Sequence, residues 1–79
     1  MLALTAGDLT QQVGALLIDE VKGEPGQVEL SQSTIAELLG STRPSINRVL
    51  RGFAARGHVR LGFRRIEVID PAGLHASLD

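Results

Sequence analysis

Residues 30–57 decide the fold, and they read LSQSTIAELLGSTRPSINRVLRGFAARG. Ser31 is a suitable helix N-cap, because its hydroxyl can accept a backbone N–H of the first turn. A helix is predicted to follow it, since apolar residues recur at helical spacing. Its predicted inward positions are Ile35, Leu38 and Leu39. Gly40 is expected to end this helix in the left-handed conformation that suits glycine.

A further helix is predicted after a very short turn. Thr42 can cap it, and Pro44 falls in its first turn, where a missing N–H does no harm. Two helices joined by so tight a glycine turn form a helix-turn-helix unit. Residues 31–57 are therefore predicted to be such a unit.

The predicted helix over residues 43–56 has two distinct faces. At about 100° per residue, one apolar stripe holds Ile46, Val49, Leu50 and Phe53. The opposite side carries Pro44, Arg48, Arg51 and Ala55, and Asn47 lies between the two sides. A solvated face would normally mix glutamate with lysine, whereas this face has no acid. Arginine offers a planar donor fork to phosphate and to guanine, so the face is predicted to contact nucleic acid.

The charges of the whole chain are segregated in the same way. Residues 38–66 contain seven arginines and no acid, whereas residues 1–37 contain six acids and one lysine. Such a run of like charges repels itself, and a polyanion would relieve the repulsion. The alternative is an ordinary solvated surface whose counter-charges come from elsewhere in the fold.

Elements are predicted on both sides of the helix-turn-helix unit. A first helix is expected over residues 5–22, with Thr5 as N-cap of a box that ends at Asp8. Leu2 and Leu4 lie before that cap. Residues 27–30 alternate between polar and apolar and are predicted to form a short strand.

A β-hairpin is predicted over residues 58–69. Its strands read Val59-Arg60-Leu61 and Ile66-Glu67-Val68-Ile69, and the turn between them carries Arg64 and Arg65. A short helix is expected over residues 71–78, with Asp70 as N-cap. The predicted fold class is mainly α with a small hairpin wing, a winged helix-turn-helix.

Length and composition exclude several classes of protein. Seventy-nine residues make one small domain, and the absence of cysteine excludes disulfides and thiol nucleophiles. No apolar run has the length of a membrane span and no secretory signal opens the chain, so no membrane location is expected. The absence of cysteine fits a reducing compartment, and a cytoplasmic location is expected. His58 and His75 are isolated, and no metal-binding or phosphate-loop motif occurs. We therefore expect no enzyme, no catalytic residue and no metal site, and a packing role for His58.

Residues 30–70 resemble the DNA-binding domain of the Crp/Fnr regulators. The resemblance rests on the motif segments Leu30-Ser31-Gln32, Ile35-Ala-Glu-Leu-Leu-Gly40 and Arg43-Pro-Ser-Ile-Asn-Arg48-Val-Leu50. The last segment meets every position of the family's pattern. The hairpin that ends at Pro71 is also similar to the family's wing. With the first helix, the resemblance covers about residues 6–74.

The resemblance implies that Arg43 and Arg48 read guanines in the major groove, and Pro44 and Asn47 complete the predicted base-reading set. Pro44 stands where the family often has glutamate, and proline cannot accept a hydrogen bond from cytosine. The half-site preference should therefore differ from that of the glutamate-bearing branch. Predicted phosphate contacts are Ser31, Ser33, Thr42, Ser45, Arg51, Arg60, Arg64 and Arg65. Capping is the alternative role for the hydroxyl residues.

The resemblance also implies partners outside this domain. Family members carry an N-terminal sensor and a dimerisation helix, so the chain is expected to be an excised domain, or else a small stand-alone protein. No cofactor is expected here, because a cyclic nucleotide or another effector would bind the sensor. Expected partners are double-stranded DNA, a second copy in the full-length regulator and, as a further candidate, RNA polymerase.

The predicted function is sequence-specific binding of double-stranded DNA in transcription regulation. Residues 43–56 would enter the major groove, and the wing arginines would lie on the phosphate backbone. One alternative is a winged helix that binds protein and not DNA, which requires an apolar patch on the third helix. Other bacterial winged-helix regulators would share the same chemistry.

Overall fold

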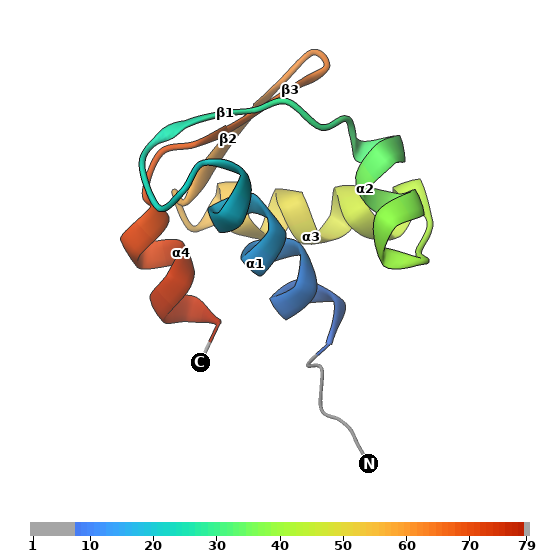
Figure 1. Cartoon of the computed structure of the whole chain (residues 1–79), viewed down its shortest axis with the longest axis horizontal. Coiled ribbons are helices and arrows are strands. Elements are labelled where there is room, and N and C mark those ends of the chain that lie inside the picture. Colours follow the sequence, from blue (N-terminus) through green and yellow to red (C-terminus); the bar gives the residue numbers. More distant parts are fainter. Residues whose placement is uncertain (1–7, 79) are drawn as a thin grey trace.

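The computed structural model describes residues 8–78, and in this part of the chain a small antiparallel sheet lies along one side of four helices (Figure 1). The elements are α1 Leu9–Glu20, β1 Gly26–Val28, α2 Gln32–Leu39, α3 Arg43–Ala55, β2 Val59–Gly62, β3 Arg65–Val68 and α4 Pro71–Ser77. Helices α1, α2 and α3 pack together, α4 packs against α1, and the β2–β3 hairpin projects beyond the helices. This is the predicted winged helix-turn-helix.

The helix-turn-helix unit forms as its capping residues predict. The Ser31 hydroxyl accepts the Thr34 N–H at 3.0 Å, and the Thr42 hydroxyl accepts the Ser45 N–H at 3.3 Å. Gly40 ends α2 with a φ of 65°, in the left-handed region that favours glycine. The two predicted N-caps and the glycine stop are therefore confirmed.

Leu38 was predicted to face inward, and this is wrong, because the residue is 60% exposed. Helix α2 buries Ile35 and Ala36, so its inward direction lies between these two residues. Leu39 falls close to that direction and is half-buried, whereas Leu38 is rotated about 110° away from it. Leu38 therefore lies at the surface, although it belongs to the apolar pattern of α2.

Helix α1 begins later than predicted. It starts at Leu9, and Asp8 is its N-cap: the Asp8 carboxylate accepts the Gln11 N–H at 3.0 Å, and the Asp8 N–H donates to the Gln11 side chain at 3.1 Å. Asp8 and Gln11 thus form the capping box that the sequence prediction assigned to Thr5 and Asp8. Thr5 itself, like Leu2 and Leu4, lies outside the described residues.

A third strand, β1, joins the two strands of the hairpin in one sheet. Its order is β1-β3-β2, with antiparallel neighbours throughout. The predicted strand over residues 27–30 is observed at Gly26–Val28, where Val28 pairs with Ile66, so Leu30 lies beyond it. Both Val28 and Ile66 are buried, and the hairpin is therefore anchored on the core by β1.

The core draws on every helix and strand. Its buried apolar residues are Val13, Leu17, Val28, Ile35, Ala36, Ile46, Leu50, Phe53, Val59, Ile66, Val68 and Leu74. The predicted stripe of α3 is confirmed, with Ile46, Leu50 and Phe53 buried and Val49 half-buried. Arg48 and Arg51 consequently face outward.

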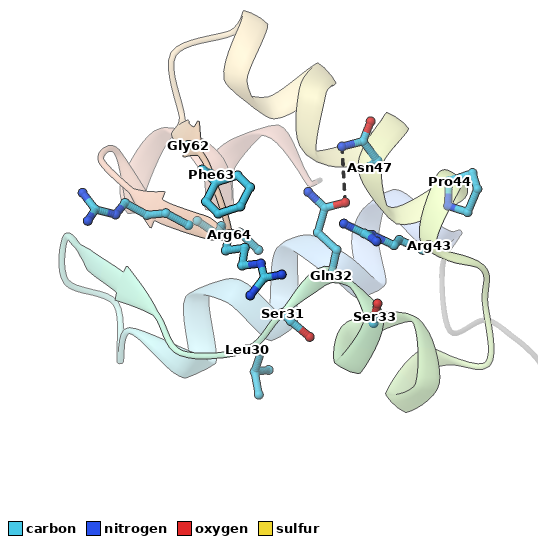
Figure 2. A pocket seen from close by; sticks show the side chains of 12 residues that line it. Leu30, Ser31, Gln32, Ser33, Arg43, Pro44, Asn47, Gly62, Phe63 and Arg64 are labelled. Carbon is cyan, nitrogen blue, oxygen red and sulfur yellow. Dashed lines mark hydrogen bonds between the residues drawn. The ribbon is translucent and has the colours of Figure 1, made fainter.

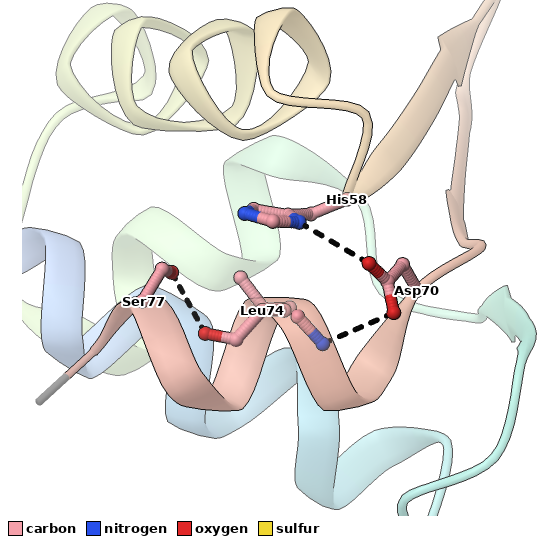
Figure 3. Close-up of polar contacts among 5 residues, drawn as sticks. His58, Asp70, Leu74 and Ser77 are labelled. Carbon is pink, nitrogen blue, oxygen red and sulfur yellow. Dashed lines mark hydrogen bonds and ion pairs between the residues drawn. The ribbon is translucent and has the colours of Figure 1, made fainter.

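His58 joins α3, the hairpin and α4. Its N–H donates to the Phe53 carbonyl at 3.0 Å, and its own carbonyl accepts the N–H groups of Ile69 and Asp70 at 3.0 and 3.1 Å. The imidazole is mostly buried, with Nδ1 3.8 Å from an Asp70 carboxylate oxygen (Figure 3). The other Asp70 oxygen accepts the Gly73 N–H and caps α4. The side chain thus has the packing role that the sequence suggested.

The observed orientation of α2 predicts that the larger truncation, Leu38→Ala, destabilises the domain less than the smaller one, Ile35→Val. Leu38→Ala removes an exposed side chain and should change the free energy of unfolding by no more than about 0.5 kcal/mol. Ile35→Val removes one methylene from a fully buried position and should cost about 0.5–1.5 kcal/mol. Urea unfolding followed by circular dichroism compares the two variants. A larger loss from Leu38→Ala would contradict this orientation of α2.

Candidate nucleic-acid interface

An open groove lies between the hairpin and the first turns of α2 and α3 (Figure 2). Its volume is about 830 Å³. Its lining residues are Leu30, Ser31, Gln32, Ser33, Arg43, Pro44, Asn47, Gly62, Phe63, Arg64, Arg65 and Ile66. The groove is thus built from three segments that are distant in the sequence.

The groove is electropositive. Arg43 lies on the helix wall, and Arg64 and Arg65 come from the hairpin, whereas no lining residue is acidic. All three arginines are exposed, and within residues 8–78 none has a carboxylate at ion-pair distance. The first turns of two helices add the partial positive charge of their free N–H groups. This arrangement suits an extended anion.

The serine and threonine residues predicted to contact phosphate differ in whether their hydroxyl groups already make hydrogen bonds within the domain. Ser31 donates to the Thr34 hydroxyl at 3.0 Å, and Thr42 donates to the Ser45 hydroxyl at 2.9 Å, in addition to the caps they provide. Ser33 lines the groove and makes no side-chain hydrogen bond within the described part of the chain. Ser33 is therefore the hydroxyl most available to a ligand, and capping is the role observed for Ser31 and Thr42.

Asn47 is held in the groove by a neighbour that sequence reasoning missed. Its side-chain amide donates to the Gln32 carbonyl oxygen at 3.2 Å, which ties α3 to the first turn of α2 (Figure 2). The Asn47 oxygen and the Gln32 amide remain for a ligand. Gln32 stood in the family motif without a role, because only the approach of the two helices reveals one.

The predicted base-reading residues are not all brought together. Arg43, Pro44 and Asn47 line the groove, whereas Arg48 lies in a smaller depression with Thr10 of α1 and Arg56. Arg48 lies five positions after Arg43, so its side chain is rotated about 140° around the helix from that of Arg43. Arg48 therefore faces the side of α3 that lies toward α1.

Four predicted phosphate contacts also lie outside the groove, namely Thr42, Ser45, Arg51 and Arg60. Arg51 is exposed on α3 but lines neither depression. Arg60 faces Glu67 across the hairpin, with 3.7 Å between guanidinium and carboxylate. The alternative of counter-charges supplied by the fold therefore holds for Arg60, which is the one arginine with a carboxylate partner within the described residues.

Phe63 and its contact with Arg64 were also missed. Phe63 lines the groove from the hairpin tip and is 90% exposed. The Arg64 guanidinium lies 5.3 Å from the centre of its ring, at the distance of a cation–π contact. The available signal was the position of one of only two aromatic residues inside a predicted turn.

Residues 8–78 contain neither a metal-binding cluster nor a membrane-spanning helix. No group of three or more histidine, cysteine, aspartate or glutamate side chains in this range is arranged to hold a metal ion. None of the described helices combines the length and the apolar character that a membrane crossing requires.

The sequence matches known proteins over nearly its whole length. The Crp-like helix-turn-helix domain family matches residues 8–77. A Mycobacterium tuberculosis protein, HTH-type transcriptional regulator Cmr, is 37% identical over 76 residues, which are 96% of this chain and 30% of that protein. The chain thus spans about a third of the length of this relative.

Solved structures share the fold. A crp/fnr-family transcriptional regulator from Eubacterium rectale has a TM-score of 0.78 at 32% identity, over 87% of this chain and 32% of its own. A CRP/FNR-family regulator from Thermus thermophilus has 0.77 at 22% identity, over 89% and 40%. The CO-dependent transcription factor CooA from Carboxydothermus hydrogenoformans has 0.76 at 22% identity, over 91% and 37%. At 22% identity the last two show the fold alone.

These matches, the winged helix-turn-helix and the acid-free groove agree with the resemblance seen in the sequence. They concern transcriptional regulators and no class of enzyme. The chain belongs to the Crp-like helix-turn-helix family, the DNA-binding domains of Crp/Fnr-type transcriptional regulators.

Proposed function

We propose that this domain reads a specific sequence of double-stranded DNA as the output domain of a Crp/Fnr-type regulator. One observation carries the proposal: an acid-free groove, with an arginine on its helix wall and two on its hairpin wall, opens where α3 and the wing can contact the duplex together. Helix α3 would enter the major groove, which has room for one helix. The wing would lie along the backbone beside it.

Base reading would be concentrated at the start of α3. The exposed Arg43 guanidinium can donate to O6 and N7 of one guanine. Pro44 has no hydrogen-bonding side chain, so at most it contacts a thymine methyl. Asn47, oriented by Gln32, can pair with an adenine. Arg48 would read its base from the opposite side of α3, apart from the base that Arg43 contacts.

Phosphate contacts would hold the domain in register. Arg65 and Ser33 are exposed in the groove, one on each wall, and Arg51 is exposed on α3. Phosphate contacts carry no base information but position the protein. Arg60 should contribute less, because its guanidinium already faces Glu67.

The remaining expectations concern the whole regulator. We propose a two-fold dimer that places two copies of this domain on half-sites about 34 Å apart, one turn of DNA. An effector would act through another domain, so this domain itself would need no cofactor and would catalyse no reaction. RNA polymerase remains a proposed partner of the full-length protein.

The alternative, a winged helix that binds only protein, draws support from the exposed apolar side chains Leu38 and Phe63. They belong to α2 and to the hairpin, however, and not to α3. The exposed side of α3 carries Pro44, Arg48 and Arg51. It therefore lacks the broad apolar patch that this alternative requires, and DNA remains the better match.

Binding should depend steeply on salt. Each neutralised phosphate contributes a slope of about −0.9 to log K against log salt concentration, and about four to six contacts are expected. Fluorescence anisotropy with a labelled duplex at several salt concentrations measures the slope. A flat salt response, or no binding at low salt, would contradict the proposed function.

Single substitutions should separate base reading from phosphate contact. Arg43→Ala should cost about 1–3 kcal/mol on the preferred sequence and flatten the preference at one base pair. Arg65→Ala should weaken binding to all sequences alike and reduce the salt slope by about one contact. Anisotropy on duplexes with single base changes measures both effects.

Arg60→Ala is the matched control on the same hairpin. It removes the same charge from an exposed position that already has a carboxylate partner, so its effect should be smaller than that of Arg65→Ala. The proposed docking is wrong if hairpin variants change the base preference at the Arg43 position while Arg43→Ala leaves it intact.

A further inference from the structure

The tip of the wing carries an aromatic side chain in water. Phe63 follows Gly62 in the loop between β2 and β3 and is 90% exposed, whereas the other phenylalanine, Phe53, is buried in the core. Burying a phenylalanine side chain is strongly favourable. The fold gains nothing of this from Phe63, so the residue is suited to a partner outside the described residues.

Arg64 is unusual at the same place. Its φ of 54° lies in the left-handed region, which glycine and asparagine enter more easily than arginine. Its guanidinium lies over the Phe63 ring, 5.3 Å from the centre. The two tip residues therefore form one unit, a flat apolar ring covered by a cation.

The surroundings of this unit indicate which partner it fits. Phe63 and Arg64 line the same acid-free groove as Arg43, and Arg65 follows directly. An apolar protein surface would have to bury these cations. A DNA minor groove instead offers sugar walls to an apolar ring and a negative potential to a guanidinium, strongest where A·T pairs make the groove narrow.

We propose that the wing tip enters the minor groove beside the major groove that α3 occupies. Phe63 packs on the sugar walls and base edges there, and Arg64 senses the groove's width and potential. This inference rests on the proposed function, since it requires α3 to be docked on DNA. It assigns sequence preference to the wing, at base pairs flanking those read by Arg43.

The flanking preference should follow the minor groove alone. Guanine projects its N2 amino group into the minor groove, and inosine lacks that group while keeping guanine's major-groove pattern. We expect duplexes with A·T or inosine·cytosine flanks to bind about equally, and roughly fivefold more tightly than duplexes with G·C flanks. Anisotropy at one fixed salt concentration measures the three affinities. If inosine·cytosine flanks behave like G·C flanks, the proposal is overturned.

Two variants of the wing tip and one control variant test whether Phe63 and Arg64 cause the flanking preference. Phe63→Ala should lose about tenfold in affinity on A·T flanks with an unchanged salt slope, because an apolar contact releases no counterions. Arg64→Gly should lose the flanking preference. Because glycine suits the left-handed turn better than arginine, this loss cannot come from a damaged loop. Arg65→Ala should weaken binding but keep the flanking preference. If Phe63→Ala keeps the wild-type affinity and flanking preference, the proposal is overturned, and a protein becomes the better candidate partner of the wing tip.

A fluorescent variant tests whether the tip becomes buried. The chain has no tryptophan and no tyrosine, so Phe63→Trp places a single reporter at the tip. Its emission should shift to the blue, and acrylamide should quench it less, when the duplex is added. A reporter that stays fully exposed in the complex overturns the minor-groove contact. The effect of Arg43→Ala on base preference is independent of this result, so the proposed function can stand where this inference fails.

Discussion

The burial of one stripe of α3 determines most of the structure. Ile46, Leu50 and Phe53 are almost completely buried, and the helix they define packs against α1, α2 and β2. Since a helix that buries one side must expose the other, the same packing directs Arg48 and Arg51 outward. The charged surface of α3 is therefore a consequence of the core and needs no polar interaction of its own to hold it in place.

The second requirement is a fixed angle between α3 and the wing, because the groove exists only between them. The backbone of His58 supplies this link. Its N–H donates to the Phe53 carbonyl near the end of α3, and its carbonyl accepts the N–H groups of Ile69 and Asp70, which directly follow β3. Strand β1 adds a third attachment by pairing Val28 with Ile66. The tip of the wing is thus carried by a base that is bonded to the core on both sides.

The sequence predicted what depends on local spacing and missed what depends on packing between segments. The caps at Ser31 and Thr42 and the apolar stripe of α3 follow from residues within one or two helical turns. The exposure of Leu38, by contrast, depends on which side of α2 packs against its neighbours, and that side is the one of Ile35 and Ala36. Gln32 acquires its role only where α2 meets α3. Arg43 and Arg48 matched one family motif, yet the helix carries them to different sides.

The arginines of the groove contribute little to the stability of the fold. Arg43, Arg64 and Arg65 make no ion pair within residues 8–78, so their removal deprives the folded domain of little. Arg60 differs, because Glu67 partly neutralises it. Substitution at these three exposed arginines can therefore change what the groove binds with little loss of stability. Pro44 illustrates this freedom: it fits the first turn of α3, where its missing N–H does no harm, and it lines the groove without a side-chain hydrogen-bond acceptor.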